Sequence, residues 1–363
     1  MQQALTILLV VSALLCALLT TLTVVRKVRR DRNEASILAR RAEFRDLLLG
    51  GSPEALAAGL GRANHDLQVR FDLITAFDAI WPSLDDKRRE VVRTAITTSH
   101  IDRALTKQLR SRDPVRRASA AMLIGRLGVT DAAALVAPLL ADHDGDVRLT
   151  AAQVLGVIAD DASAYELVAA LGARHLEPER LIERLGHPWA VPAMLHVLEG
   201  EGAAVRPTDE APEPSISWQP IGASLARALG LAGDVRAEPA LLVLLRSGAL
   251  EERIAAARAL EAAGTAAGVP ALEAAVEDPA WQVRAQAARS LGGLGVTASV
   301  PALAAHLSDP AWWVRAAVAD SLVELGDPGL EVLRDALVHH PDRFARDRAR
   351  EALAVHHLET DAG

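Results

Sequence analysis

Arginines recur along the chain at a spacing that first suggests an anion-binding surface. Two groups share a 31-residue step: Arg117 and Arg148, and then Arg253, Arg284, Arg315 and Arg346. A row of guanidinium groups could bind phosphate or carboxylate. An aspartate often lies just before the arginine, however, and aspartate is a favoured helix cap. We therefore expect the aspartates to cap helices and the arginines to form a ladder between successive structural units.

Three patterns contain residue types found in metal sites. Residues 142–146 read Asp-His-Asp-Gly-Asp, like the start of a calcium loop, but position 12, which supplies an acidic ligand in such loops, is Gln153. Histidine pairs occur at residues 339–340 and 356–357, and adjacent positions of a helix point to different faces. The single cysteine, Cys16, can form neither an internal disulfide nor a cysteine metal site. We expect no metal ion.

The sequence contains no Walker loop, no dinucleotide-binding fingerprint and no Gly-x-Ser-x-Gly elbow. Its serines and aspartates are accounted for by helix caps and turns. We therefore expect no catalytic residue, no cofactor and no enzymatic activity.

Three tryptophans are the candidate partner-binding residues: Trp281, Trp312 and Trp313. Each follows an Asp-Pro pair closely, near an expected loop. Exposed aromatic side chains can anchor a protein partner, although a tryptophan at this place can also cover the ends of neighbouring helices. Covering is the favoured explanation, but it fits Trp312 and Trp313 least well, because adjacent helical positions cannot both face one core direction.

The elements that position these residues are helix pairs in a repeating register. Glycine, proline and a second arginine column keep the same 31-residue step: Gly233, Gly264, Gly295 and Gly326; Pro239, Pro270 and Pro301; Arg227, Arg258 and Arg289. Several independent columns in one register establish an internal repeat. Such a pair of helices buries its apolar surface only by stacking on its neighbours.

Each unit is expected to hold two helices. Asp278-Pro279 and Asp309-Pro310 should supply the N-cap and the first residue of the first helix. Gly295 should end one such helix, and Pro301 should begin the second helix of that unit. Apolar residues at three- and four-residue steps give the first helix its buried face, and small residues such as Ala287 allow neighbouring helices to approach closely.

These motifs resemble the HEAT-repeat family, in the short bacterial form also found in phycobilin lyases and in deoxyhypusine hydroxylase. The resemblance rests on the Asp-Pro openings, on Val283-Arg284 and Val314-Arg315, on the alanine pairs and on the Leu-Gly endings, and it covers roughly residues 113–357. It implies an all-α solenoid. The hydroxylase binds iron through repeated His-Glu pairs, and this sequence has no His-Glu dipeptide, so that activity is not implied.

Residues 4–25 form an apolar segment without charge or proline. As a helix, its 22 residues extend about 33 Å, enough to cross a hydrocarbon core of about 30 Å. A cleaved signal peptide is the alternative, but no basic region precedes the segment and no small-x-small cleavage motif follows it. We expect one transmembrane helix.

Four basic residues flank this segment: Arg26, Lys27, Arg29 and Arg30. The positive-inside rule places this flank in the cytoplasm, with the N-terminus outside. The flank could also bind anionic lipid, although setting the topology explains it without a specific lipid. The whole chain has a net charge of −8, and residues 26–49 carry +4. The rest of the chain therefore carries −12, which disfavours nucleic acid as a partner.

The sequence therefore predicts the following organisation: a tail at 1–3, a transmembrane helix at 4–25, a basic juxtamembrane helix at 26–50, divergent helical repeats at 51–112, repeats at 113–200, a Pro/Glu-rich insertion loop at 201–217, repeats at 218–357 and a tail at 358–363. The insertion is either a functional loop or a tolerated surface addition.

The expected function is a scaffold or adaptor, single-pass in a bacterial inner membrane, whose cytoplasmic repeats bind a protein partner. The alternatives are a phycobilin-lyase-like protein that handles a small molecule, and a periplasmic adaptor of inverted topology. A solenoid of this kind is expected to offer a curved surface and no deep preformed pocket.

Overall fold

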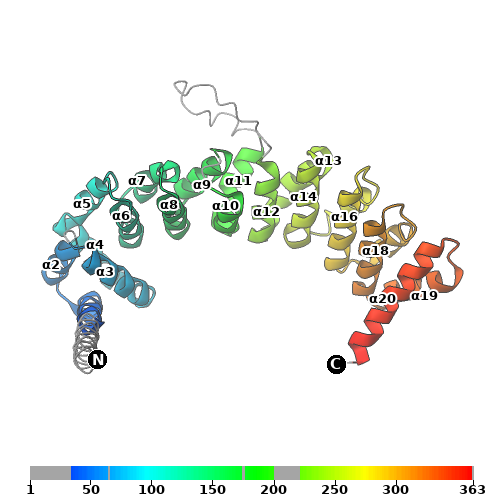
Figure 1. Cartoon of the computed structure of the whole chain (residues 1–363), viewed down its shortest axis with the longest axis horizontal. Coiled ribbons are helices and arrows are strands. Elements are labelled where there is room, and N and C mark those ends of the chain that lie inside the picture. The colour runs from blue at the N-terminus through cyan, green and yellow to red at the C-terminus, as the bar shows by residue number, and fades with distance from the viewer. Residues whose placement is uncertain (1–33, 64–65, 174–175, 200–220, 362–363) are drawn as a thin grey trace, which may run out of the picture. The chain divides into compact units, whose positions relative to one another are not determined.

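The computed structural model describes residues 34–63, 66–173, 176–199 and 221–361, and all regular structure within them is helical (Figure 1). The chain divides into two compact units, one ending at Ala132 and one beginning at Ala133. Each unit stacks helix pairs as an α-solenoid does, which agrees with the expected fold class.

The first unit begins with a helix over residues 34–50. The following helices are α2 (Pro53–Ala63), α3 (Leu67–Ile80), the 3-10 turn η1 (Trp81–Ser83), α4 (Asp86–Ser99), α5 (Ile101–Gln108) and α6 (Pro114–Leu127). Helix α2 packs on α3 and α4, α3 packs on α6, and α5 lies against α4 and α6. Residues 51–112, expected to be divergent repeats, are thus helical where the structure describes them.

The second unit continues the series. Its elements are α7 (Ala132–Val136), η2 (Ala137–Ala141), α8 (Gly145–Ile158), α9 (Asp161–Ala173), α10 (Pro178–Leu185), η3 (Pro188–Ala190), α11 (Val191–Leu198), α12 (Gly222–Ala232), η5 (Val235–Ala237), α13 (Glu238–Ser247), α14 (Leu250–Ala263), α15 (Val269–Ala275), α16 (Trp281–Gly293), η6 (Thr297–Ser299), α17 (Val300–Ala304), α18 (Trp312–Glu324), α19 (Asp327–His339) and α20 (Arg343–Asp361). One layer consists of α12, α14, α16, α18 and α20, each packed on the next. The other layer includes α13 packed on α15 and α17 packed on α19.

The buried faces follow the apolar periodicity of the repeats. In α16, Val283, Ala287 and Leu291 are fully buried, and in the second helix of that repeat Leu303 is also fully buried. Alanine at position 288 is buried as well, so α16 approaches its neighbours without large side chains between them. Pro301 lies in the first turn of α17, as expected.

The glycine column ends helices at most of its positions. Gly233, Gly295 and Gly326 have φ values of 61°, 68° and 70°, the left-handed conformation that glycine adopts without a steric penalty. Gly264 is the exception, because it caps α14 in extended conformation with φ of −85°. The expectation that this column ends helices is confirmed, but by two different backbone geometries.

The predicted helix starts are wrong by two residues. Helices α16 and α18 begin at Trp281 and Trp312, and their N-caps are alanines without a side-chain cap. Asp278 instead accepts a hydrogen bond from the Ala280 N–H, which forms a turn ahead of the helix. The prolines therefore lie in this turn and not at the first helical position.

The helix over residues 34–50 is fastened to the first unit by charged groups. The fully buried Asp72 of α3 accepts hydrogen bonds from Arg40 Nε at 2.7 Å and Arg41 Nε at 3.1 Å. Arg88 of α4 donates to the carbonyl oxygens of Leu47, Leu48 and Gly51. These carbonyls belong to the end of the helix or follow it, where intrahelical partners are missing.

The close packing of α19 against α18 can be tested at Gly329. A Cβ atom at this position would overlap the carbonyl oxygen of Leu322, a backbone atom that cannot rotate away. We expect Gly329→Ala to lower the free energy of unfolding by roughly 2–3 kcal/mol, because overpacking forces the backbone to shift. Urea denaturation followed by circular dichroism measures the change.

Gly61 of α2 is the matched control for this substitution. A Cβ atom there meets nothing within 4 Å, so Gly61→Ala should be neutral or slightly stabilising. Equal midpoints for the two variants would contradict the packing argument.

Among residues 34–361, in the parts that the structure describes, no helix is both long and apolar enough to cross a membrane. The predicted transmembrane segment 4–25, its basic flank and the insertion loop 201–217 lie outside the described residues. Those expectations stay predictions.

Candidate functional site

The anchor arginines clamp the loop that precedes their own helix. The Nη1 group of Arg284 donates to the carbonyl oxygens of Asp278 and Pro279 at 2.8 and 3.2 Å. In this pattern Nη1 donates to the carbonyl oxygens of the residues six and five positions earlier. It recurs at Arg117, Arg148, Arg315 and Arg346. Arg253 donates only to the carbonyl five positions earlier, that of Gly248. The arginine spacing thus repeats one local hydrogen-bonding motif.

Two of these arginines also tie successive repeats together. Arg253 forms a bidentate ion pair with Asp278, at 2.9 and 3.1 Å, and Arg284 forms one with Asp309, at 2.8 and 2.9 Å. The predicted ladder is confirmed at these two steps, and the guanidinium groups involved are engaged within the protein. They do not form an anion-binding surface.

The environment of Asp309 shows how the ladder holds its charge. Burial acts to raise the pKa of the Asp309 carboxyl, but hydrogen bonds from Arg284 and from the Ala311 N–H, with the charge of Arg284, outweigh burial and lower it. The carboxylate therefore remains ionised and accepts both guanidinium N–H groups.

The calcium-like segment and the pair His339 and His340 have structural roles, and the side chains of the second pair, at residues 356–357, lie outside the description. Asp144 caps α8 by accepting hydrogen bonds from the N–H groups of Asp146 and Val147. His339 lies at the end of α19 with its Nδ1 atom 2.8 Å from Asp335, and His340 accepts a hydrogen bond from the Asp342 N–H. No group of three potential metal-ligating side chains occurs among the described residues.

The three predicted partner-binding tryptophans lie together on the protein surface. Trp281 begins α16, and Trp312 and Trp313 begin α18, which follows it in Figure 1. The rings of Trp281 and Trp313 are nearly parallel, with centroids 6.4 Å apart, and Trp312 meets Trp313 edge to face at 4.6 Å. Their exposed fractions are 39%, 48% and 54% in sequence order, so these tryptophans cover one another only partly.

A fourth aromatic residue and three arginines extend this surface. Phe344 of α20 is 50% exposed, and the guanidinium groups of Arg315 and Arg343 lie 5.2 and 5.0 Å from its ring centroid. The guanidinium group of Arg348 lies 5.4 Å from the centroid of Trp312. We call Trp281, Trp312, Trp313 and Phe344 the aromatic cluster.

Phe344 was not among the binding residues predicted from the sequence. The available signal was the repeat register, because Phe344 follows Trp313 by 31 residues, as Trp312 follows Trp281. Two adjacent columns of the repeat are therefore aromatic at two successive positions each. The contacts of Arg315 with Phe344 and of Arg348 with Trp312 were missed because they join separate helices.

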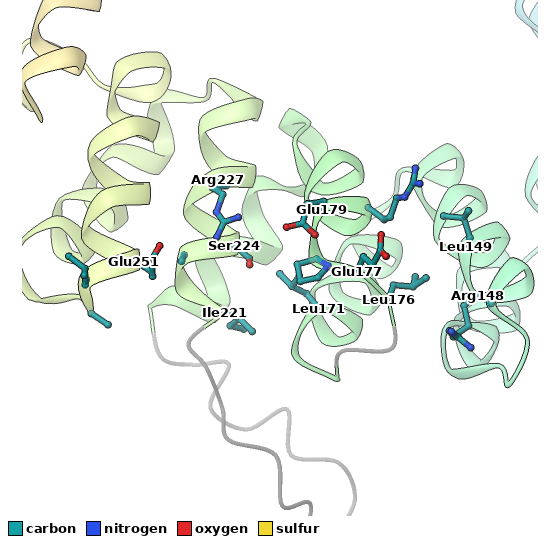
Figure 2. Close-up of a pocket in the computed structure, with 16 residues that line it drawn as sticks. Arg148, Leu149, Leu171, Leu176, Glu177, Glu179, Ile221, Ser224, Arg227 and Glu251 are labelled. Atoms are coloured by element: carbon teal, nitrogen blue, oxygen red, sulfur yellow. The ribbon is translucent and has the colours of Figure 1, made fainter. Parts of the chain in front are cut away.

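A broad groove crosses the ends of α8, α10, α12 and α14. The sequence predicted a curved surface without a deep pocket and did not predict this groove. Its volume is about 1010 Å³. Figure 2 shows Ser224 and Arg227 of α12 facing Glu179 of α10, with Arg148 and Glu251 at opposite ends. Among the described residues, no ion pair joins these charged side chains. Their charges are mixed and spread along the groove, so they do not converge on one point as catalytic groups do.

A second hollow of about 700 Å³ lies over Gly292 and Gly293 of α16. Glu261 and Glu324 reach it from the two flanking helices, close to where Cβ atoms of these glycines would be. Partial burial raises the pKa of the Glu324 carboxyl, and the negative charges of Glu261 and Asp320 raise it further. Arg258 and Arg289 also line the hollow, so it is not a purely acidic site.

The raised pKa of Glu324 leads to a prediction about pH. The pKa of Glu324 is higher in the folded protein than in the unfolded one, so the protonated carboxyl contributes stability at acidic pH. That contribution is lost as the pH rises through the folded-state pKa. We expect Glu324→Gln to be slightly more stable than the parent protein at pH 7, with the difference closing as the pH falls below the pKa of an ordinary glutamate. Thermal denaturation over a pH series measures it, and a difference that widens at low pH would contradict the assignment.

Comparison with family models gives the repeat type. The model described as HEAT repeats matches residues 103–180 and 269–354, and the model described as PBS lyase HEAT-like repeat matches residues 252–278. These segments of the chain are similar to HEAT repeats. The expected resemblance is confirmed in this respect, and the aromatic cluster lies on these repeats. The comparison with curated proteins found no match.

Solved structures with similar folds include proteins of different kinds. The CpcE–CpcF complex of phycocyanin lyase from Nostoc is 21% identical, with 64% of this chain and 92% of that chain covered and a TM-score of 0.32. Human deoxyhypusine hydroxylase is 19% identical, with coverages of 88% and 98% and a TM-score of 0.29. Kap95p, solved with RanGDP, is 14% identical, with coverages of 89% and 43% and a TM-score of 0.39.

Proposed function

We propose that this protein is a membrane-anchored scaffold whose HEAT repeats bind a protein partner, and that it is not an enzyme. The observation that carries the proposal is the aromatic cluster, in which four rings from three successive helices are left about half exposed. Large aromatic side chains are enriched where protein interfaces gain most of their binding energy. The ladder beside the cluster gives it a rigid support.

The membrane part of the proposal rests on the sequence of residues 4–30. A charge-free segment of 22 residues is followed by four basic residues, which supports a single span with the repeats on the cytoplasmic side of a bacterial inner membrane. The contacts of Arg88 and of the arginines that reach Asp72 support a second point: the helix over residues 34–50 belongs to the folded part.

Crosslinking and affinity purification test the scaffold proposal. The full-length protein is purified from membranes, and a variant that begins at residue 34 is purified from the membrane-free fraction of cells that express it, with the helix over residues 34–50 retained in both. A stoichiometric protein retained by both samples supports the scaffold and places binding on the repeats. No protein partner in either sample would overturn the proposal.

A reporter fusion tests the proposed topology. Alkaline phosphatase placed after Gly363 should be inactive, because the enzyme needs the oxidising periplasm. An active fusion would place the repeats outside the cytoplasm and would favour a periplasmic adaptor.

The groove across α8 to α14 is the observation that favours a second candidate function, the handling of a small molecule as in a lyase. Its volume is in the range of ligand sites. The absorption spectrum and the metal content of the purified full-length protein separate this candidate from the scaffold. A stoichiometric pigment, metal or other small molecule without a protein partner would move it to first place.

A further inference from the structure

We propose that the aromatic cluster binds an extended, acidic, proline-containing segment of a partner protein. This inference rests on the proposed scaffold function and specifies the chemistry of the partner.

The rings provide flat apolar surfaces at a fixed spacing. Trp281 and Trp313 stack from separate helices, and Trp312 is held edge to face against Trp313. Because these contacts restrict the indoles before binding, little side-chain entropy remains to be lost in the complex. Aromatic surfaces of this kind take up proline rings from an extended polyproline II segment, which is itself restricted in conformation.

Arginines lie over two rings of the cluster. Arg343 lies over Phe344 and makes no ion pair among the described residues. Arg348 lies over Trp312 and pairs with Glu351 through Nη1, but its buried Nε has no hydrogen-bond partner. A carboxylate from a partner would pair with the exposed Arg343, whereas a lysine-rich segment would be repelled.

The backbone adds to the same preference. Helices α16 and α18 both begin at the cluster, and neither has a side-chain cap on its N-terminal alanine. The N–H groups of Val283 and Val314 donate to the backbone carbonyls of the cap alanines, whereas the first two N–H groups of each helix have no side-chain acceptor from the cap, and the positive ends of two helix dipoles lie there. The rings, the arginines and the helix ends thus all favour a partner segment that is both apolar and anionic.

Peptide binding to the full-length protein tests this chemistry. The probe is a fluorescein-labelled peptide of six Glu-Pro repeats, followed by fluorescence anisotropy. Peptides of six Lys-Pro repeats and six Glu-Ala repeats are the controls for charge and for proline. We expect the Glu-Pro peptide to bind about tenfold or more tightly than either control, and its affinity to fall as salt is added.

Substitutions place the binding on the cluster. We expect Trp313→Ala and Arg343→Glu each to weaken binding of the Glu-Pro peptide by about tenfold or more. Both side chains are exposed, so neither substitution should unfold the repeats, and circular dichroism checks this. Leu231→Ala is the matched control, since Leu231 is a 63% exposed apolar residue on α12, outside the cluster.

The outcomes separate this inference from the scaffold proposal. Equal affinity for the Lys-Pro and Glu-Pro peptides, or unchanged affinity in both cluster variants, would overturn the inference. If the affinity purification still recovers a protein partner in that case, the scaffold function stands and its contact surface lies elsewhere. If it recovers none, the scaffold proposal fails too.

Discussion

Removing Arg40 and Arg41 together is expected to detach the helix over residues 34–50 from the first unit. Both guanidinium groups contact Asp72, whose side chain is fully buried. The double substitution to alanine would leave that carboxylate buried without its ion-pair partners, and losing the partner of a buried charge costs about 3–5 kcal/mol. Hydrogen exchange of residues 34–50 should accelerate by about 100-fold or more.

A nearby surface pair provides the control for this experiment. Arg45 pairs with Asp46 at 3.3 Å, but both side chains are more than half exposed. We expect Arg45→Ala to change the free energy of unfolding by less than about 0.5 kcal/mol, because solvent screens such pairs. Similar exchange rates in the double variant and in Arg45→Ala would show that the Asp72 contacts do not hold the helix.

The second large effect is expected for Arg284→Ala in the ladder. This one side chain pairs with Asp309 and clamps two loop carbonyls. Its loss leaves a nearly buried carboxylate unpaired, so we expect the free energy of unfolding to fall by about 3 kcal/mol at pH 7. Arg289→Ala is the control on the same helix, because Arg289 is exposed and makes no ion pair among the described residues.

The same variant has a characteristic pH dependence. In the parent protein the pKa of Asp309 is lowered, so its stabilising contribution is present at neutral pH and is lost as the pH falls through that pKa. The difference between parent and Arg284→Ala should therefore shrink in acid. Urea denaturation at a series of pH values measures this, and a difference independent of pH would show that Asp309 does not carry the effect.

The repeat architecture was predictable from the sequence because it depends on local patterns. The 31-residue columns located the buried faces, the glycines that end helices and the two confirmed steps of the ladder. The starts of α16 and α18 were misplaced because the Asp-Pro rule considers only local capping. Arg284 and Arg315 hold the carbonyls of Asp278, Pro279, Asp309 and Pro310, which keeps these residues in the turn before each helix.

The candidate sites were predictable only in part. Exposure of Trp312 and Trp313 followed from their adjacency, whereas the contacts of Arg315 with Phe344 and of Arg348 with Trp312 depend on how α18 and α20 pack. The Asp72 contacts were missed because the repeat pattern is weak before residue 113. The groove depends on α10, which has only eight residues between Glu177 and Gly186, and no single motif signals its volume.

The ladder stops before the last helix, and this affects the dynamics of the C-terminal end. The residue 31 positions after Asp309 is His340, so Arg315 meets no aspartate there and lies against Phe344 instead. In a linear array of repeats, the most weakly tied end opens first. Helix α20 should therefore exchange its amide hydrogens sooner than α16 and α18.

The aromatic cluster spans the boundary between α18 and α20. Its tryptophans lie on α16 and α18, which the ladder holds together, and Phe344 lies on α20, which is expected to open first. A partner that contacts both sides would have to hold α20 closed, and the free energy needed for that closure would be subtracted from its affinity. Slower exchange in α20 would then report occupancy of the cluster. Exchange in α20 would thus show whether the proposed binding surface is occupied.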